Sequence, residues 1–274
     1  MGRRFGQHFL TRKSILDQIA ASACPEIHPD AGASVIEIGA GRGALTQALL
    51  ERVLLERASK VTAIEVDPVL VHYLQQKFRD ALESGRLELV QGDVLKTDLA
   101  SLSPDALPVI AGNLPYYITS PILEQVFRLG ERWTRAVFLV QSEVAARLAA
   151  SPGGRDYGYL SVLTQVHARP QILFEVPRAA FRPAPKVDSA VVLLEPRDAA
   201  QEWNLPDKRA FLRFASACFQ HKRKTLRNNL APCYGKERLD ALAEGRLRAE
   251  QLSVPQLADL YRQLAHGGAP QCEE

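Results

Sequence analysis

Residues 1–197 alternate short apolar runs with longer amphipathic stretches. Strands are predicted where Val, Ile, Leu and Ala run together, at 34–38, 61–66, 87–90, 108–111 and 136–140. Helices are predicted where apolar residues recur at helical spacing, at 44–58, 68–82, 121–129 and 143–150. Strands that alternate with helices of this length form parallel βαβ units. The pattern therefore predicts an open α/β sheet.

The pattern changes towards the C-terminus. Two further apolar runs, 171–176 and 190–195, flank a proline-rich loop and are predicted to extend the same sheet. After Pro196 only helical patterns appear, rich in Arg, Leu and Ala. We therefore expect two domains, an α/β domain at 1–197 and a small all-α domain at 198–274.

A glycine-rich turn joins the first predicted strand to the helix that follows it. Gly39, Gly41 and Gly43 allow a tight turn and the close approach of a ligand. The helix that starts there offers unpaired N–H groups. Glu65 ends the second strand, where a carboxylate can accept hydrogen bonds from ribose hydroxyls. Together these residues predict a site for an adenosine-containing cofactor.

The glycine pattern alone leaves the identity of that cofactor open. Its spacing also fits a dinucleotide site, and a tight turn without any ligand is a further reading. Glu37 favours S-adenosylmethionine, because a carboxylate there could hold the amino group of that cofactor. Asp93 ends the third strand and could accept from the adenine amine, or simply cap a helix. An NAD-dependent oxidoreductase rests on the glycine pattern alone and lacks a candidate acid or base for hydride transfer.

The segment Asn113-Leu114-Pro115-Tyr116 follows the fourth predicted strand. The side-chain oxygen of Asn113 and the carbonyl of Leu114 could accept the two hydrogens of an adenine amine and stabilise positive charge developing on its nitrogen. Pro115 would aim that carbonyl, and Tyr116 offers a face on which a base can stack. The segment predicts methyl transfer to an exocyclic amine, without a metal. The alternative is a turn in which Asn113 caps a helix and an aromatic ring only fills space.

At these residues the chain resembles the ribosomal RNA adenine N6,N6-dimethyltransferases, and within them the bacterial small-subunit branch tied to kasugamycin sensitivity. The resemblance covers nearly the whole chain through motifs at 5–10, 35–41, 113–116, 141–144, 157–162, 176–189 and 222–228. It implies a Rossmann-like, S-adenosylmethionine-dependent methyltransferase domain followed by a helical RNA-docking domain. Two positions depart from many relatives, which have Asn where this chain has His8 and Tyr117.

The resemblance also assigns roles to individual residues. It implies that His8 and Leu10 close over the cofactor, and that Tyr116 and Phe181 sandwich the target base. The cofactor-binding residues expected in this way are His8, Leu10, Glu37, Gly39, Gly41, Glu65, Asp93 and Asn113. The catalytic residues expected are Asn113, Leu114, Pro115, Tyr116 and Phe181.

Positive charge is concentrated at 201–230 and in a second basic group near the start of the chain, Arg3, Arg4, Arg12 and Lys13. Residues 201–230 contain seven basic and two acidic side chains, a net charge of +5, whereas the whole chain carries +3. Such a run is usually a solvated helix face, but it has few interleaved acids, and with the resemblance it predicts contact with an RNA backbone. The expected RNA-binding residues are Arg3, Arg4, Lys186, Lys222, Arg223, Lys224 and Arg227.

The resemblance implies dimethylation of two adjacent adenosines near the 3′ end of 16S rRNA, in a small ribosomal subunit that is still assembling. The alternatives are a ribosome-assembly factor in which binding dominates, a large-subunit rRNA methylase of the macrolide-resistance type, and a mitochondrial transcription-factor relative. The expected partners are small-subunit rRNA and the pre-30S particle.

The composition also predicts where the protein acts. The sequence has no apolar run long enough to span a membrane and no secretory signal pattern. Its four cysteines lie far apart without a C-x-x-C pair, which predicts neither a zinc site nor a disulfide framework. The six histidines show no ligand spacing, so no metal site is expected. We expect a cytoplasmic protein without a membrane partner, and a monomer.

Overall fold

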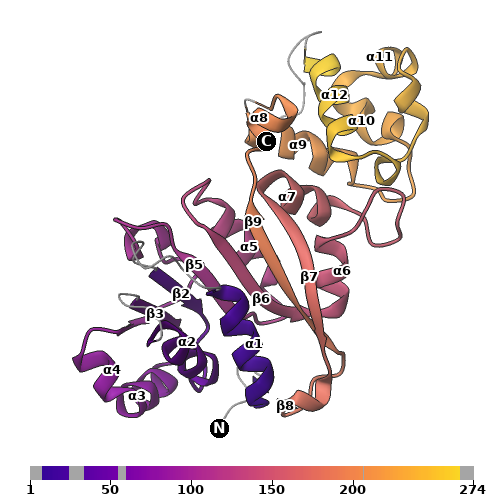
Figure 1. The fold of residues 1–274 in the computed structure, drawn as a ribbon. Helices are drawn as coiled ribbons and strands as arrows, with labels where there is room; N and C mark the ends of the chain where they lie inside the picture. Colours follow the sequence, from indigo (N-terminus) through magenta and orange to yellow (C-terminus); the bar gives the residue numbers. More distant parts are fainter. Residues whose placement is uncertain (1–7, 25–33, 55–59, 206, 266–274) are drawn as a thin grey trace. The chain divides into compact units, whose positions relative to one another are not determined.

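The computed structural model describes residues 8–24, 34–54, 60–205 and 207–265 (Figure 1). The chain forms two compact units. The first unit comprises residues up to 145 together with 169–196, and the second comprises 146–168 together with the residues from 197 onward. Each unit is described by itself below.

The first unit contains a seven-stranded sheet in the order β4-β3-β2-β5-β6-β9-β7. Its strands are β2 (Ser34–Ile38), β3 (Lys60–Glu65), β4 (Leu87–Gln91), β5 (Val109–Asn113), β6 (Arg135–Gln141), β7 (Ala168–Val176) and β9 (Ser189–Pro196). The pairs from β4 to β6 are parallel, whereas β9 runs antiparallel to β6. The sheet confirms the predicted α/β class and the two later strands.

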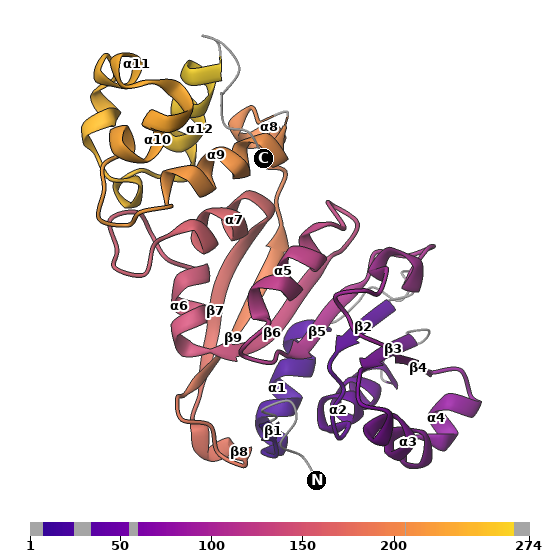
Figure 2. The ribbon, with the colours of Figure 1, turned by 180° about the vertical axis from the view of Figure 1, so that it is seen from behind.

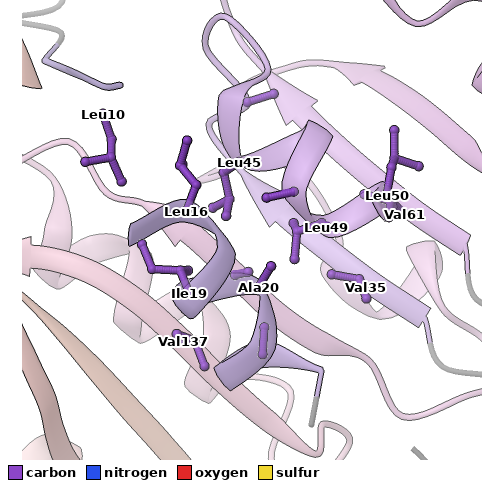
Figure 3. Close-up of a cluster of buried hydrophobic side chains, with 14 of the residues drawn as sticks. Leu10, Leu16, Ile19, Ala20, Val35, Leu45, Leu49, Leu50, Val61 and Val137 are labelled. Carbon is purple, nitrogen blue, oxygen red and sulfur yellow. The ribbon is translucent and has the colours of Figure 1, made fainter. Parts of the chain in front are cut away.

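Helices cover the sheet on both faces. Helix α1 (Lys13–Ala23) and helix α2 (Ala44–Leu54) pack on one face, where Ile19 and Leu49 meet Val35, Val61 and Val137 of the strands (Figure 3). Helix α5 (Thr119–Phe127) lies on the other face, which Figure 2 shows from behind. Its buried side chains are not part of the cluster formed by α1 and α2. Strands covered on both faces lack polar alternation, which explains their continuous apolar runs in the sequence.

Three more helices lie between strands along the chain. They are α3 (Pro68–Lys77) and α4 (Arg79–Glu83) of the first unit, and α6 (Ser142–Leu148), in which the chain passes from the first unit to the second. Pro68 occupies the first turn of α3, and the Asp67 side chain caps that helix by accepting from the Val69 N–H at 2.9 Å. The single helix predicted at 68–82 is thus two helices, which meet at Phe78, whose φ of −113° is not helical.

A second, two-stranded sheet joins the start of the described chain to a distant loop. Strand β1 (Phe9–Leu10) pairs antiparallel with β8 (Phe181–Arg182), which follows the short 3-10 helix η2 (Arg178–Ala180). In this pairing Leu10 lies opposite Phe181. The Thr11 N–H also donates to the Ala180 carbonyl at 3.0 Å. These bonds hold the N-terminal segment against the proline-rich loop.

The second unit is helical. It contains α7 (Tyr159–His167), α8 (Ala199–Trp203), α9 (Lys208–Cys218), α10 (Leu226–Tyr234), α11 (Lys236–Asp240) and α12 (Val254–Ala265), with short 3-10 turns η3 (Ala243–Arg246) and η4 (Ala249–Gln251). The expected boundary left residues 146–168 in the first domain. They belong instead with the helical unit, because Tyr157, Val162 and Val166 are buried in one apolar cluster with Phe211 and Leu257.

The cysteines partly depart from the expectation. Cys24 and Cys218 are buried and keep their thiols, whereas Cys233 is disulfide-bonded. In the part of the chain that the structure describes, no helix is long and apolar enough to cross a membrane. The same residues contain no group of three or more His, Cys, Asp and Glu side chains placed to hold a metal ion.

Candidate active site

The parallel strands end at a common level, and this register creates the site. Ile38 of β2 lies opposite both Ile64 of β3 and Gly112 of β5. Gly39, Glu65 and Asn113 each follow one of these residues, so they stand side by side at the carboxyl edge of the sheet. Ligands of open α/β sheets bind at this edge.

A pocket opens at this edge and is lined by residues of the first unit. It contains all the expected cofactor-binding residues and four of the five expected catalytic residues, namely His8, Leu10, Glu37, Gly39, Gly41, Glu65, Asp93, Asn113, Leu114, Pro115 and Tyr116. Phe9, Arg42 and Tyr117 also line it, and no role had been expected for them. The ring of Tyr117 is an exposed large apolar surface, with 63% of its area accessible at the mouth.

The glycine turn contains residues with positive φ angles, a conformation that glycine adopts readily. Gly39 and Gly41 have φ angles of +75° and +58°, a region that side chains with a Cβ rarely adopt. A Cβ on Gly41 would lie 3.2 Å from the Phe9 ring, and the Arg42 guanidinium lies over that ring at 4.7 Å from its centroid. The N-terminal strand therefore packs directly on the glycine turn.

Glu65 holds the glycine turn from the neighbouring strand. Its two carboxylate oxygens accept from the Gly41 N–H at 2.7 Å and from the Asp67 N–H at 3.0 Å. The side chain is nearly fully buried. Two backbone donors fix this carboxylate in the pocket. Each of its oxygens has a second lone pair, and these lone pairs could accept hydrogen bonds from ribose hydroxyls.

Glu37 is a buried carboxyl group that faces the pocket from β2. Burial raises its pKa to about 7, and the nearby charge of Glu65 also raises it. The Thr46 hydroxyl donates to Glu37 at 2.6 Å and, together with the positive charge of Lys77, lowers this pKa. Glu37 therefore exchanges a proton near neutral pH and can become charged when a cationic group enters the pocket.

Asp93 follows β4 and lines the same pocket. Its carboxylate accepts from the Leu95 N–H at 3.0 Å, so it caps the turn in which it lies. Asp93 therefore makes the capping bond expected of a purely structural residue. It also lies in the pocket, as a residue that binds the cofactor must. Contact with an adenine amine stays a prediction.

The turn at Asn113 is held by the chain on both sides. The Asn113 side-chain nitrogen donates to the His8 carbonyl at 3.1 Å, and the Leu114 N–H donates to the Leu139 carbonyl at 3.0 Å. The Tyr116 hydroxyl lies 2.9 Å from the Ser189 hydroxyl. Because the amide of Asn113 uses its nitrogen for His8, its oxygen is the end available to a ligand.

His8 sits over this turn. Its ring stacks on Tyr116 with centroids 5.9 Å apart and planes inclined by 24°. Its Nδ1 donates to the Pro183 carbonyl at 2.9 Å. The N-terminal segment is therefore tied to the Asn113 turn and to the proline-rich loop at one residue.

Residues 1–266 match the ribosomal RNA adenine dimethylase family. The chain belongs to this family. Proteins named ribosomal RNA small subunit methyltransferase A from Thiobacillus denitrificans and Pseudomonas aeruginosa are 41% and 40% identical to it. The alignments cover 92% and 96% of this chain, and 93% and 94% of those two proteins.

Solved structures agree with this assignment. A dimethyladenosine transferase from Plasmodium falciparum aligns with a TM-score of 0.75 and 25% identity, over 96% of this chain and 99% of its own. The 23S rRNA methyltransferase ErmE aligns with a TM-score of 0.67 and 27% identity, over 94% of this chain and 99% of its own. The enzyme is therefore an rRNA adenine dimethyltransferase that uses S-adenosylmethionine. The Cβ-free glycine turn and the buried carboxyl of Glu37 fit a cofactor that carries an amino group.

Phe181, the second expected base-stacking residue, is buried in the dimethyltransferase. It has no exposed surface and lies in the apolar core beneath β1, with Leu10 opposite it in the small sheet. It is not among the residues that line the pocket, and its contact with the target base stays a prediction. An apolar ring gains more from this core than from an exposed position at the pocket mouth.

The expected RNA-binding residues differ in their surroundings. Lys222, Arg223 and Lys224 are exposed in the turn between α9 and α10, and the Lys222 ammonium donates to the Arg155 carbonyl at 3.0 Å. Arg227 instead makes a two-pronged ion pair with Asp240, so its charge is balanced within the unit. Lys186 is exposed in the loop before β9, and Arg3 and Arg4 lie outside the described residues.

Proposed function

We propose that the enzyme transfers two methyl groups to each of two adjacent adenosines near the 3′ end of 16S rRNA, in a small subunit that is still assembling. Relatives that share about 40% identity over nearly the whole chain carry the name small subunit methyltransferase, which supports this substrate. On this proposal the protein acts in the cytoplasm, as a monomer.

The geometry of the Asn113 turn carries the proposal. The methyl group of S-adenosylmethionine is electrophilic because it is bound to a sulfonium. The Asn113 oxygen and the Leu114 carbonyl accept the two hydrogens of the adenine amine, which directs its lone pair at the methyl group and stabilises the charge that develops on nitrogen. Pro115 restricts the backbone there, and Tyr116 supplies the stacking face.

The other pocket residues hold the cofactor. Glu37 accepts from its amino group, Glu65 from its ribose hydroxyls and Asp93 from its adenine amine. These carboxyl groups come from or follow β2, β3 and β4, which are neighbours in the sheet, and all three line the same pocket. Leu10, which is buried, and the glycine turn enclose the middle of the ligand.

The exposed turn at Lys222–Lys224 is proposed to bind the RNA backbone. Lysine and arginine contacts to phosphate supply affinity but little sequence discrimination. Base selection then falls to the pocket, which accepts an unstacked adenine. A role mainly in subunit assembly uses the same surfaces and differs by not requiring methyl transfer.

The test is methyl transfer from labelled S-adenosylmethionine to unmethylated small subunits, large subunits and free rRNA, followed by mass spectrometry of the digested RNA. Dimethyladenosine in small-subunit rRNA is the expected product. Asn113→Ala should abolish it while Gln75→Ala, an exposed amide on α3, should not. Label in large-subunit rRNA alone would indicate a methylase of the resistance type. Tight particle binding without any transfer would overturn the proposed reaction and favour an assembly factor.

A further inference from the structure

Lys77 reaches the glycine turn from the last turn of α3. Its ammonium donates to the Arg42 carbonyl at 3.0 Å and to the Gly43 carbonyl at 3.2 Å. The same ammonium lies 4.8 Å from the centroid of the Phe78 ring. These carbonyls belong to the end of the glycine turn, where α2 begins.

Helix α3 packs against this part of the turn without spare room. A Cβ on Gly43 would lie 2.5 Å from Phe78 and 2.7 Å from Leu74, so α3 touches the backbone there. Glu65 holds the middle of the turn through Gly41, and Lys77 holds its end. The turn that cradles the cofactor is thus fixed from two neighbouring elements.

Lys77 also acts on the charge inside the pocket. The groups that influence Glu37 are the Thr46 hydroxyl from α2, the Glu65 carboxylate from β3 and the Lys77 ammonium from α3. Glu65 repels a negative charge on Glu37, whereas Lys77 attracts it. Partial burial lowers the pKa of Lys77, while the charge of Glu37 raises it. The ammonium therefore favours the ionised form of Glu37, against the repulsion from Glu65.

We propose that Lys77 is a positioning residue for S-adenosylmethionine. It holds the end of the glycine turn through two carbonyls, and its charge favours the ionised Glu37 that receives the amino group of the cofactor. The proposal rests on the role proposed for Glu37 and is independent of which RNA is methylated.

The experiment measures the affinity for S-adenosylhomocysteine by calorimetry between pH 5.5 and 8.5, for the wild type and for Lys77→Met, Lys77→Arg and the exposed control Lys236→Met. Lys77→Met should weaken binding roughly tenfold at pH 7 and move the pH midpoint of binding upward. Lys77→Arg should restore both quantities, and Lys236→Met should leave them unchanged. Lys77→Gln replaces Lys77→Met if the latter does not fold.

A purely structural role for Lys77 makes a different prediction. The affinity of Lys77→Met would then fall by the same factor at every pH, with no change in the midpoint, and the proposal would be overturned. Unchanged affinity would also overturn it. In a Glu37→Gln background, replacing Lys77 should no longer move any midpoint. Each readout is cofactor binding, so failure of the proposed rRNA reaction would leave this test unaffected.

Discussion

His8 stacks on Tyr116, 108 residues further along the chain, with the two ring planes inclined by 24°. The Asn113 side chain holds the carbonyl of the same histidine. The N-terminal segment, which the resemblance implies closes over the cofactor, is therefore in direct contact with the turn that is proposed to hold the target adenine. Movement of one changes the surroundings of the other.

The first prediction concerns this stack. His8→Ala removes the ring contact with Tyr116 and the bond to Pro183, each worth about 1 kcal/mol. We expect the N-terminal strand to open more often, seen as faster amide hydrogen exchange at Thr11, whose N–H donates to Ala180. His8→Phe, which keeps only the stack, should fall between the wild type and His8→Ala. Equal exchange in all three proteins would show that the ring does not hold the segment.

The second prediction concerns pH. The pKa of Glu37 is raised to about 7 by burial, and the carboxylate is the form that binds an amino group. Cofactor affinity should therefore fall as the pH drops below about 7, and Glu37→Gln should bind more weakly with a flat profile. The folded protein favours the protonated carboxyl, so this group stabilises the fold at low pH, and that contribution is lost as the pH rises from 4.5 through about 7. Chemical denaturation across this range, with Glu37→Gln as the control, measures the loss.

The third prediction separates two roles of Phe181. As a core residue, Phe181→Ala should lower the free energy of unfolding by about 3–5 kcal/mol, whereas Phe181→Leu should cost much less. Phe181→Leu should then keep nearly full methyl transfer. A Phe181→Leu protein that is stable but inactive would restore the base-stacking role that the resemblance implied.

The fourth prediction concerns the basic turn. Replacing Lys222, Arg223 and Lys224 by alanine should weaken RNA binding. It should also reduce the slope of log Kd against log [salt] by the equivalent of roughly two to three phosphate contacts. Arg227→Ala should change that slope less, because Arg227 is paired with Asp240. Titrations at several salt concentrations measure both slopes. A larger change for Arg227→Ala than for the triple variant would contradict the assignment.

Much of the first unit could be predicted from the sequence because its strands are local apolar runs. The glycine turn, Glu65 and Asn113 could be placed at one sheet edge because each follows such a run. The pairing of Phe9 and Leu10 with Phe181 and Arg182 could not be predicted from the sequence, because a strand of two residues has no periodicity. Its existence depends on a partner more than 170 residues away.

Other features also depended on distant contacts. Phe181 was expected at the pocket from its motif, but burial is decided by what packs above it. Segment 146–168 has a helical pattern in either unit, and only the apolar cluster around Phe211 assigns it. Arg227 lies in a basic run, yet Asp240 neutralises it from the next helix. Sequence spacing reports none of these three-dimensional neighbours.

The chain enters the helical unit at residue 146, leaves it at 168 and returns at 197. As the polypeptide leaves a ribosome, β6 therefore emerges before α7, and the antiparallel partner of β6, β9, emerges after it. Helix α7 packs against α9 and α12, so it cannot complete its packing until these later helices have been synthesised. Each unit thus begins before the other is finished, and the first unit is complete at residue 196, before α9 and α12 have emerged. A protein cut at residue 197 would carry α7 without α9 and α12, so the buried side chains of α7 that pack on them would be exposed to solvent.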